Sequence, residues 1–238
     1  MDDKAVKKVL LHIYERLISR YGPQKWWPAE GTFEVIVGAI LTQSAAWTNV
    51  EKAIRNLKAS GKMSPQAIRQ LSQVELAQII RPSGYYNVKA KKLLAFVQWL
   101  EEQYNYDLKK LFSTETSELR KQLLDIFGIG EETADSIMLY AANKPIFVID
   151  AYTRRIIERA GLAPIENSYA AYQALFMNSL PADTKLFNEY HALLVRLGKA
   201  VCKTRPNCDK CCLNTTDITD TEHSYTEYAC SIISQPHS

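Results

Sequence analysis

The chain has 238 residues, enough for one large domain or two small ones with hydrophobic cores of their own. Its composition, 47% hydrophobic and 23% charged, is ordinary for a globular protein, and no apolar stretch reaches the roughly 18 residues that a membrane-spanning helix needs. The stretch KKVLLHIYERLI carries charges at helical spacing, so we expect an amphipathic helix rather than a signal peptide, and a soluble cytoplasmic protein.

Charge is distributed unevenly along the chain. The net charge is +3, but no Lys or Arg follows Leu213, and residues 1–213 carry 29 basic and 22 acidic side chains. This mildly basic body, with a net charge of +7, is compatible with a polyanionic partner without requiring one. We expect residues 214–238 to form an acidic, poorly ordered tail.

Apolar residues recur at helical spacing along almost the whole chain. The predicted helical segments are 6–22, 33–43, 50–61, 74–84, 88–104, 118–128, 133–143, 151–162, 168–180 and 186–202. Many end at Gly or Asn, and prolines fall in the gaps between them. The single β-leaning run, PIFVID, is too short and isolated to build a sheet, so the sequence predicts an all-α fold.

Two glycines separated by one residue mark a tight turn between two predicted helices, at Gly128-Ile129-Gly130. A dinucleotide-binding fingerprint is excluded because no strand precedes the turn and Thr133 stands where a third glycine is needed. The pattern predicts a helix–hairpin–helix, whose backbone N–H groups suit a phosphate oxygen. A plain helical hairpin with a glycine turn is the commoner explanation of this motif taken alone.

Asp150 follows the apolar run and directly precedes the predicted helix AYTRRIIERAG. Its ordinary role at such a position is a helix N-cap. Farther along, the cysteines cluster in CKTRPNCDKCC, which in a reducing compartment indicates metal binding rather than disulfides.

Taken together, the stretches 33–57, 79–94, 123–162 and 190–202 resemble, in order, the endonuclease III superfamily of helix–hairpin–helix DNA glycosylases. The resemblance covers about residues 5–213. It implies two helical lobes with a DNA-binding cleft between them. We expect residues 30–144 to form a helical barrel domain containing the hairpin, and residues 1–29 and 145–213 to form a second helical domain that ends in the cysteine loop.

By this resemblance Asp150 is the catalytic aspartate. A carboxylate beside C1′ stabilises the positive charge that develops on the sugar, and it can orient or deprotonate the attacking water. The resemblance also implies a set of DNA contacts around the hairpin. These residues are Gln43, Gly128, Ile129, Gly130 and Thr133. Separately, the basic cluster of Lys89, Lys91 and Lys92 is a candidate for contacts with phosphates, although a solvated helix face explains it equally well.

Glutamate stands where bifunctional members of the family carry a lysine nucleophile, at Glu132. A carboxylate cannot form a Schiff base, so we expect base release by water without strand cleavage. Glu131 and Glu132 also complement the dipole of the helix that they begin, and Glu132 is a further candidate for the base pocket.

The stretch Trp26-Trp27-Pro28, together with RPSGYYNVKAK, resembles the endonuclease III-like 3-methyladenine DNA glycosylases. In that branch this stretch helps to form the base pocket. Indole faces attract a positively charged alkylated base by cation–π interaction, after the base has been flipped out of the duplex. One buried and one exposed tryptophan is the simpler alternative.

The spacing of Cys202, Cys208 and Cys211 resembles the start of the family's [4Fe–4S] loop. The fourth cysteine is missing, because Asp217 stands at its place, and Cys230 lies far along the tail. A cluster is therefore an open expectation, with a structural role if it is present.

The sequence thus predicts a monofunctional DNA N-glycosylase that removes alkylated bases in base excision repair. Its partner is double-stranded DNA with a damaged base, and the resemblance implies a monomer associated with a bacterial nucleoid. The alternatives are a glycosylase for oxidised or mismatched bases and a catalytically silent DNA-binding protein. A metal or redox protein built on the cysteine loop is a further alternative.

Overall fold

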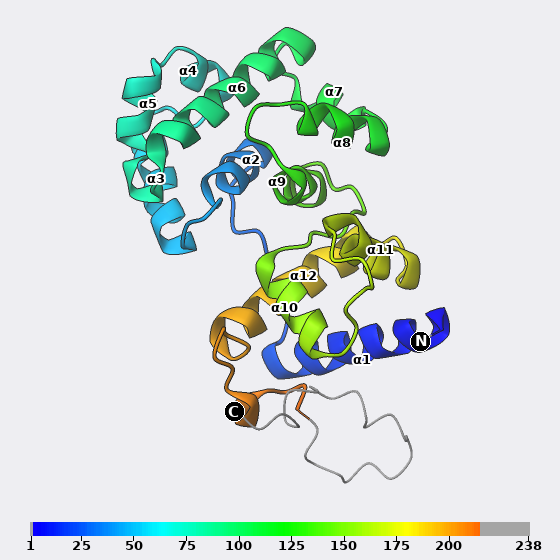
Figure 1. The fold of residues 1–238 in the computed structure, drawn as a ribbon. Coiled ribbons are helices and arrows are strands. Elements are labelled where there is room, and N and C mark those ends of the chain that lie inside the picture. The colour runs from blue at the N-terminus through cyan, green and yellow to red at the C-terminus, as the bar shows by residue number, and fades with distance from the viewer. Residues whose placement is uncertain (1, 215–238) are drawn as a thin grey trace. The chain divides into compact units, whose positions relative to one another are not determined.

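The computed structural model describes residues 2–214, and within them all regular structure is helical, which confirms the predicted all-α class (Figure 1). The α-helices are α1 (Asp3–Tyr21), α2 (Thr32–Leu41), α3 (Trp47–Ala59), α4 (Pro65–Arg69), α5 (Gln73–Ile79), α6 (Tyr86–Tyr104), α7 (Leu108–Ser113), α8 (Thr116–Leu124), α9 (Glu131–Ser136), α10 (Ala151–Arg159), α11 (Tyr169–Ser179) and α12 (Thr184–Ala200). The 3₁₀ helices η1 (Arg81–Ser83) and η3 (Cys208–Lys210) and the π-helix η2 (Ile137–Ala141) complete the set.

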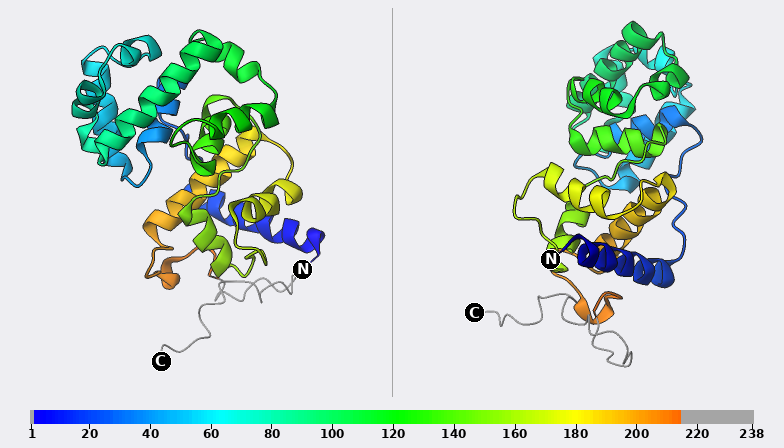
Figure 2. Two further views of the ribbon diagram at one scale, coloured as in Figure 1. Left: turned by 45° about the horizontal axis from the view of Figure 1, so that its top comes forward. Right: turned by 90° about the vertical axis from the view of Figure 1, so that its right-hand side faces the viewer.

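The chain divides into two compact units (Figure 2). Residues 27–144 form one unit, and residues 2–26 together with 145–214 form the other. The boundary falls between the two adjacent tryptophans, Trp26 and Trp27, so each unit contains one of them.

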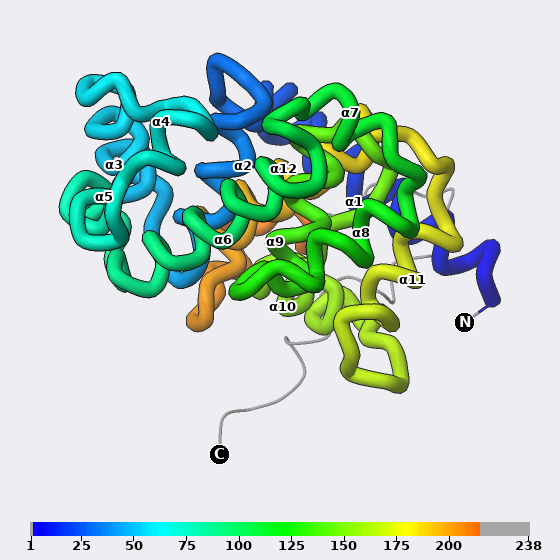
Figure 3. The backbone as a smooth tube through the Cα atoms, turned by 90° about the horizontal axis from the view of Figure 1, so that it is seen from above, coloured from blue at the N-terminus to red at the C-terminus, as the bar shows by residue number. Residues whose placement is uncertain are grey.

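In the unit of residues 27–144, α2 is the central helix. Nine of its ten residues are buried, because its sequence TFEVIVGAIL is apolar on every side. It packs against α3, α6, α9 and η2, and Figure 3 shows it beside α6. Gly38 allows the indole of Trp27 to approach the helix, since a Cβ at this position would lie 3.1 Å from the ring.

In the other unit, α12 packs against α10 and α1. The core contains stacked rings of Phe147 and Phe176, whose centroids are 3.8 Å apart, with Tyr190 set edge-on to both. The β-leaning run that contains Phe147 is an extended, buried segment rather than a strand. It leads directly into α10, and its burial fixes the position of the residue at the start of that helix.

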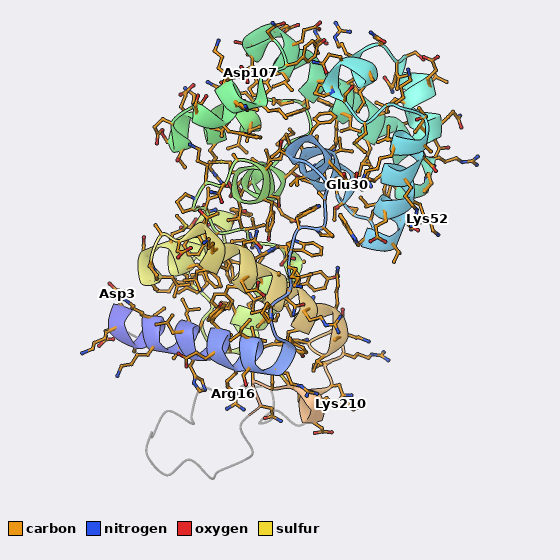
Figure 4. The ribbon with its side chains drawn as sticks, turned by 180° about the vertical axis from the view of Figure 1, so that it is seen from behind. Asp3, Arg16, Glu30, Lys52, Asp107 and Lys210 are labelled. Carbon is orange, nitrogen blue, oxygen red and sulfur yellow. The ribbon has the colours of Figure 1, made fainter. Side chains whose placement is uncertain are left out.

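Two details of the helices differ from the sequence pattern. The short helices α4 and α7 are additional, because five and six residues are too few to show a hydrophobic period. The predicted helix 133–143 changes at Ile137 from α9 to the π-helix η2. Asp3, Lys52 and Lys210 are exposed charged residues, and Asp107, also exposed, caps α7 with its side chain (Figure 4).

Candidate active site

Asp150 is the N-cap of α10, as its sequence position predicts. Its Oδ1 accepts a hydrogen bond of 2.7 Å from the backbone N–H of Thr153. Its Oδ2 lies 3.7 Å from Nε2 of His191, a residue of α12. The side chain is 12% exposed, so the carboxylate is held in one orientation at the edge of a buried environment.

The electrostatic surroundings keep Asp150 acidic. Burial by itself raises the pKa of Asp150, but the imidazole of His191 and the hydrogen bonds of Thr153 together outweigh burial and hold this pKa below its ordinary value. His191 is buried, 6% exposed, and its ring stands edge-on to Phe147. The arrangement therefore supplies an ionised carboxylate at neutral pH.

Lys199 interacts with both Asp150 and Trp26. Its Nζ lies over the Trp26 ring, 5.9 Å from the centroid. Burial lowers the pKa of Lys199, and the negative charge of Asp150 opposes that fall. Lys199 follows His191 by eight residues, about two turns of α12, so both basic side chains come from one side of that helix.

Close packing of two helices brings these groups together. At Gly198, the residue before Lys199, a Cβ would lie 2.5 Å from the ring of Tyr152 in α10. The glycine thus permits α12 to approach α10 at the helix end that Asp150 caps. Trp26, Asp150, His191 and Lys199 all belong to the same unit.

Trp27 and Pro28 belong to the other unit. The Trp27 ring is edge-on to Trp47 at 5.2 Å and tilted against Tyr140 at 5.1 Å. Tyr140 lies in η2, a π-helix, which is a feature frequent at functional sites. Pro28 is exposed and lines an open pocket of about 390 Å³ with Trp47 and several carboxylates. Trp26 and the aromatic cluster of Trp27 therefore belong to different units.

The predicted hairpin is present, between α8 and α9. Gly128 has φ of +79°, a left-handed conformation that favours glycine, and a Cβ there would lie 2.4 Å from Cγ of Lys92. Ile129 is buried and anchors the turn, and Gly130 is the N-cap of α9. Gly128 is therefore needed both for the turn and for the close passage of the Lys92 side chain, whereas a Cβ at Gly130 would meet open space.

Gln43 braces this turn. Its Nε2 donates hydrogen bonds to the backbone oxygen of Gly128 at 3.0 Å and to Oγ1 of Thr133 at 2.8 Å. Its Oε1 accepts from Nζ of Lys92. The amide that the sequence assigned to contact with DNA therefore holds the hairpin in place in this structure.

Comparison with known proteins identifies the family. Residues 37–182 match the HhH-GPD superfamily of base excision DNA repair proteins. A Methanocaldococcus jannaschii protein named as a DNA repair glycosylase is 42% identical over 205 residues, which are 86% of this chain and 93% of that protein. The chain belongs to the HhH-GPD superfamily. An endonuclease III of Sulfolobus acidocaldarius is 30% identical, over 75% of this chain and 78% of its own.

Solved structures agree with this membership of the HhH-GPD superfamily. The H. pylori 3-methyladenine DNA glycosylase bound to 1,N6-ethenoadenine matches with a TM-score of 0.67 and 27% identity, over 84% of this chain and 98% of that one. An endonuclease III–DNA complex matches with a TM-score of 0.74 over 86% and 92% of the two chains. At 20% identity the latter shows the shared fold alone.

The structure corrects the prediction for Lys89. This side chain is only 2% exposed, and its Nζ donates hydrogen bonds of 2.7 Å to the backbone oxygens of Leu41 and Ser83. Burial, and secondarily the charge of Lys92, lower the pKa of Lys89 to about 8. Lys89 is thus neither a phosphate contact nor part of a solvated face, but an internal support for the end of α2.

Glu131 and Glu132 are exposed in the first turn of α9. Behind them, Arg120 of α8 makes a two-pronged pair with the buried carboxylate of Asp135, at 2.7 and 3.1 Å. Glu131 lies 3.5 Å from the same guanidinium. One arginine therefore fastens α8 to α9 across the hairpin, and the Glu132 carboxylate remains at the surface.

Three arginines hold the cysteine loop. Arg159 donates to Sγ of Cys202 at 3.2 Å and to the backbone oxygens of residues 203 and 204, and Arg155 donates to the Cys202 oxygen. Arg16 donates to the Cys212 oxygen. Burial raises the pKa of the Cys211 thiol.

Residues 2–214 contain no group of three Cys, His, Asp or Glu side chains arranged to hold a metal. The described thiols, Cys202, Cys208 and Cys211 among them, therefore do not by themselves fit a [4Fe–4S] cluster. Asp217, Cys230 and the predicted tail from 215 onward lie outside the described residues. Among the described helices, none is both long enough and apolar enough to span a membrane.

Sequence reasoning missed His191 and Lys199. A usable signal was present in YHALLVRLGK, which places two basic side chains eight residues apart on one predicted helix. The sequence did not reveal that this side of the helix faces Asp150, because that depends on how α12 packs against α10.

Proposed function

We propose that this member of the HhH-GPD superfamily is a monofunctional DNA N-glycosylase that removes alkylated bases, with 3-methyladenine the leading candidate. Membership of the superfamily makes the chain a base excision repair DNA glycosylase. The proposal adds the reaction mechanism, the lesion and the roles of individual residues. It also takes double-stranded DNA with a damaged base as the partner of a monomeric enzyme.

The observation that carries the mechanism is the environment of Asp150. Oδ1 accepts the capping hydrogen bond from Thr153, which fixes the rotamer, and Oδ2 lies near His191. The carboxylate as a whole stays ionised. An ionised carboxylate beside C1′ stabilises the oxocarbenium-like transition state. As the bond to the base breaks, the same group accepts a proton from the attacking water.

The proposal that water, and not a lysine, attacks the sugar rests on Glu132, which follows the hairpin. Glu132 occupies the position of the family's lysine nucleophile, and its exposed carboxylate cannot form an imine with the sugar. The abasic strand should therefore remain intact when the base has left.

The proposed lesion rests on Trp26. Its ring attracts positive charge, as the Lys199 ammonium 5.9 Å from its centroid illustrates, so a positively charged purine would bind against the ring in competition with this ammonium. The similarity to a protein described as a 3-methyladenine DNA glycosylase, at 27% identity, supports the same choice.

DNA binding is assigned to the hairpin and to exposed side chains of the same unit. Phe127, 52% exposed, precedes the turn, and Nζ of Lys91 lies 4.4 Å from its ring centroid. Tyr85 is 74% exposed and has φ of +46°, a strained conformation of the kind that clusters at functional sites. Backbone N–H groups of the turn and nearby lysines would contact phosphates.

The test compares the wild-type protein with Asp150→Asn on duplex DNA that carries methylated purines. Asn is also a good N-cap, so this variant keeps the helix start and changes the charge. Free base is measured by chromatography, and strand breaks are measured before and after alkali. We expect the wild type to release base and leave alkali-labile strands, and Asp150→Asn to release at least about 100-fold less.

Two results would contradict the proposal. Strand breaks without alkali in the wild type would refute water as the sole nucleophile. Equal base release by the wild type and Asp150→Asn would reduce Asp150 to a structural cap.

A further inference from the structure

Cationic and uncharged bases differ in whether they need a proton when they leave the sugar. The inference drawn from this difference rests on the proposed function. A purine alkylated at N3 or N7 is cationic, so it leaves as a neutral molecule. An uncharged base leaves as an anion unless an acid protonates it while the bond breaks. Asp150 is ionised and cannot supply that proton.

We propose that Lys199 is a proton donor that extends this enzyme to uncharged bases. Its Nζ lies over the Trp26 ring, the surface assigned to the base, at 5.9 Å from the centroid. It follows Gly198, where α12 approaches α10, the helix that Asp150 caps. A base bound at Trp26 would therefore meet an ammonium group, with the Asp150 carboxylate in the same unit.

The acidity of Lys199 suits this role. Burial lowers the pKa of Lys199, so the ammonium gives up its proton more readily than an exposed lysine does. The carboxylate of Asp150 limits the fall and favours the protonated form. The same helix thus places one basic group, His191, against Asp150 and a second, Lys199, against the indole.

The step is balanced in protons and electrons. The electron pair of the bond between C1′ and the base stays with the base, and a proton from Nζ of Lys199 neutralises the base. Water adds its oxygen to C1′, and its proton passes to Asp150. Lys199 regains a proton from solvent and Asp150 loses one, so the net reaction is hydrolysis of the N-glycosidic bond.

The ammonium affects cationic bases in the opposite direction. It already occupies the attractive surface of Trp26 and repels a second positive charge there. Loss of the charge at Lys199 should therefore slow the release of uncharged bases and increase the release of cationic ones.

The experiment measures single-turnover base release from two duplexes, one with 1,N6-ethenoadenine (uncharged) and one with 7-methylguanine (cationic). The proteins are the wild type, Lys199→Gln, Lys199→Arg and, as a charge-matched control, Lys185→Gln. Lys185 is exposed at the start of α12. Lys199→Arg keeps a positive charge over Trp26, but a guanidinium does not give up its proton.

We expect Lys199→Gln to lower ethenoadenine release by about 100-fold and to make 7-methylguanine release a few-fold faster. Lys199→Arg should not restore ethenoadenine release, and Lys185→Gln should behave as the wild type. Intact release of 7-methylguanine in the same sample shows that the variant is folded.

Three results would overturn the inference. Equal losses on both substrates would assign Lys199 a merely structural role. A wild type that releases 7-methylguanine but no ethenoadenine would refute the inference and leave the proposed function standing. A wild type that releases neither base would overturn the proposed lesion class as well.

Discussion

The buried amine of Lys89 makes a quantitative prediction about stability. Its Nζ donates to the last backbone oxygen of α2, at Leu41, and to Ser83 in η1, and it is 2% exposed. From this end of α2 the chain continues to Gln43, which braces the hairpin. Replacing Lys89 with Met keeps most of the side-chain volume, removes both hydrogen bonds and removes the titrating group.

The sign and size of the effect follow from the pKa. Lys89 has a pKa of about 8 in the folded protein, against 10.5 for a lysine in the unfolded chain, so between these values the unfolded chain binds the proton more strongly. The free energy of unfolding of the wild type therefore rises with pH across this window, by up to about 3 kcal/mol relative to Lys89→Met. The variant lacks this contribution, and the other titrating groups cancel in the comparison.

The assay is urea unfolding of wild type, Lys89→Met and Lys91→Met at pH 7 and pH 10. Lys91 is exposed on the same helix and controls for the loss of one lysine. We expect the free energy of unfolding of the wild type, minus that of Lys89→Met, to rise by about 2–3 kcal/mol from pH 7 to pH 10. The corresponding difference for Lys91→Met should stay constant. A Lys89→Met difference that is the same at both pH values would refute the assignment of a buried, readily deprotonated amine.

Other variants test the remaining parts of the site. Arg120→Ala leaves the carboxylate of Asp135 buried without its main partner, and chemical denaturation should show a loss of about 3–5 kcal/mol, with Arg120→Lys intermediate. His191→Gln removes a group that lowers the pKa of Asp150, so the acidic limb of the pH–rate profile should move to higher pH; an unmoved limb would contradict the pairing. Arg159→Ala should lower the melting temperature, because Arg159 donates hydrogen bonds to the described part of the cysteine loop. A chelator should leave the melting temperature of the wild type unchanged. Stoichiometric iron and sulfide in the purified protein would contradict a loop held by hydrogen bonds alone.

The fold was largely predictable because the apolar residues repeat with the period of an α-helix. Element boundaries depended on local chemistry that is also visible in sequence, such as Asp150 as an N-cap and the glycines of the hairpin. The short helices α4 and α7 were not predicted, because their formation depends on what they pack against rather than on a pattern of their own. The change to a π-helix at Ile137 has no counterpart in the hydrophobic period.

Lys89 illustrates how a charged residue misleads. Read as one of three lysines, it suggested a basic surface, yet it lies four residues before Leu93 and seven before Phe96, on the apolar side of α6. The helical period therefore predicted that Lys89 is buried, whereas its charge suggested that it is exposed. What allowed the ammonium inside was a pair of backbone oxygens from two other segments, and sequence alone does not place those.

In the site, too, sequence predicts the residue itself but not the partners that tertiary packing brings to it. A carboxylate has two oxygens, and an N-cap uses one of them, so the structural and chemical roles of Asp150 do not compete. Sequence could name the residue and its cap. The partner of the second oxygen, His191, and the ammonium of Lys199 come from a helix about 40 residues farther along, and their effect on Asp150 exists only because Gly198 lets α12 approach Tyr152. A larger residue at Gly198 would therefore weaken catalysis without touching the carboxylate, through the distance between the two helices.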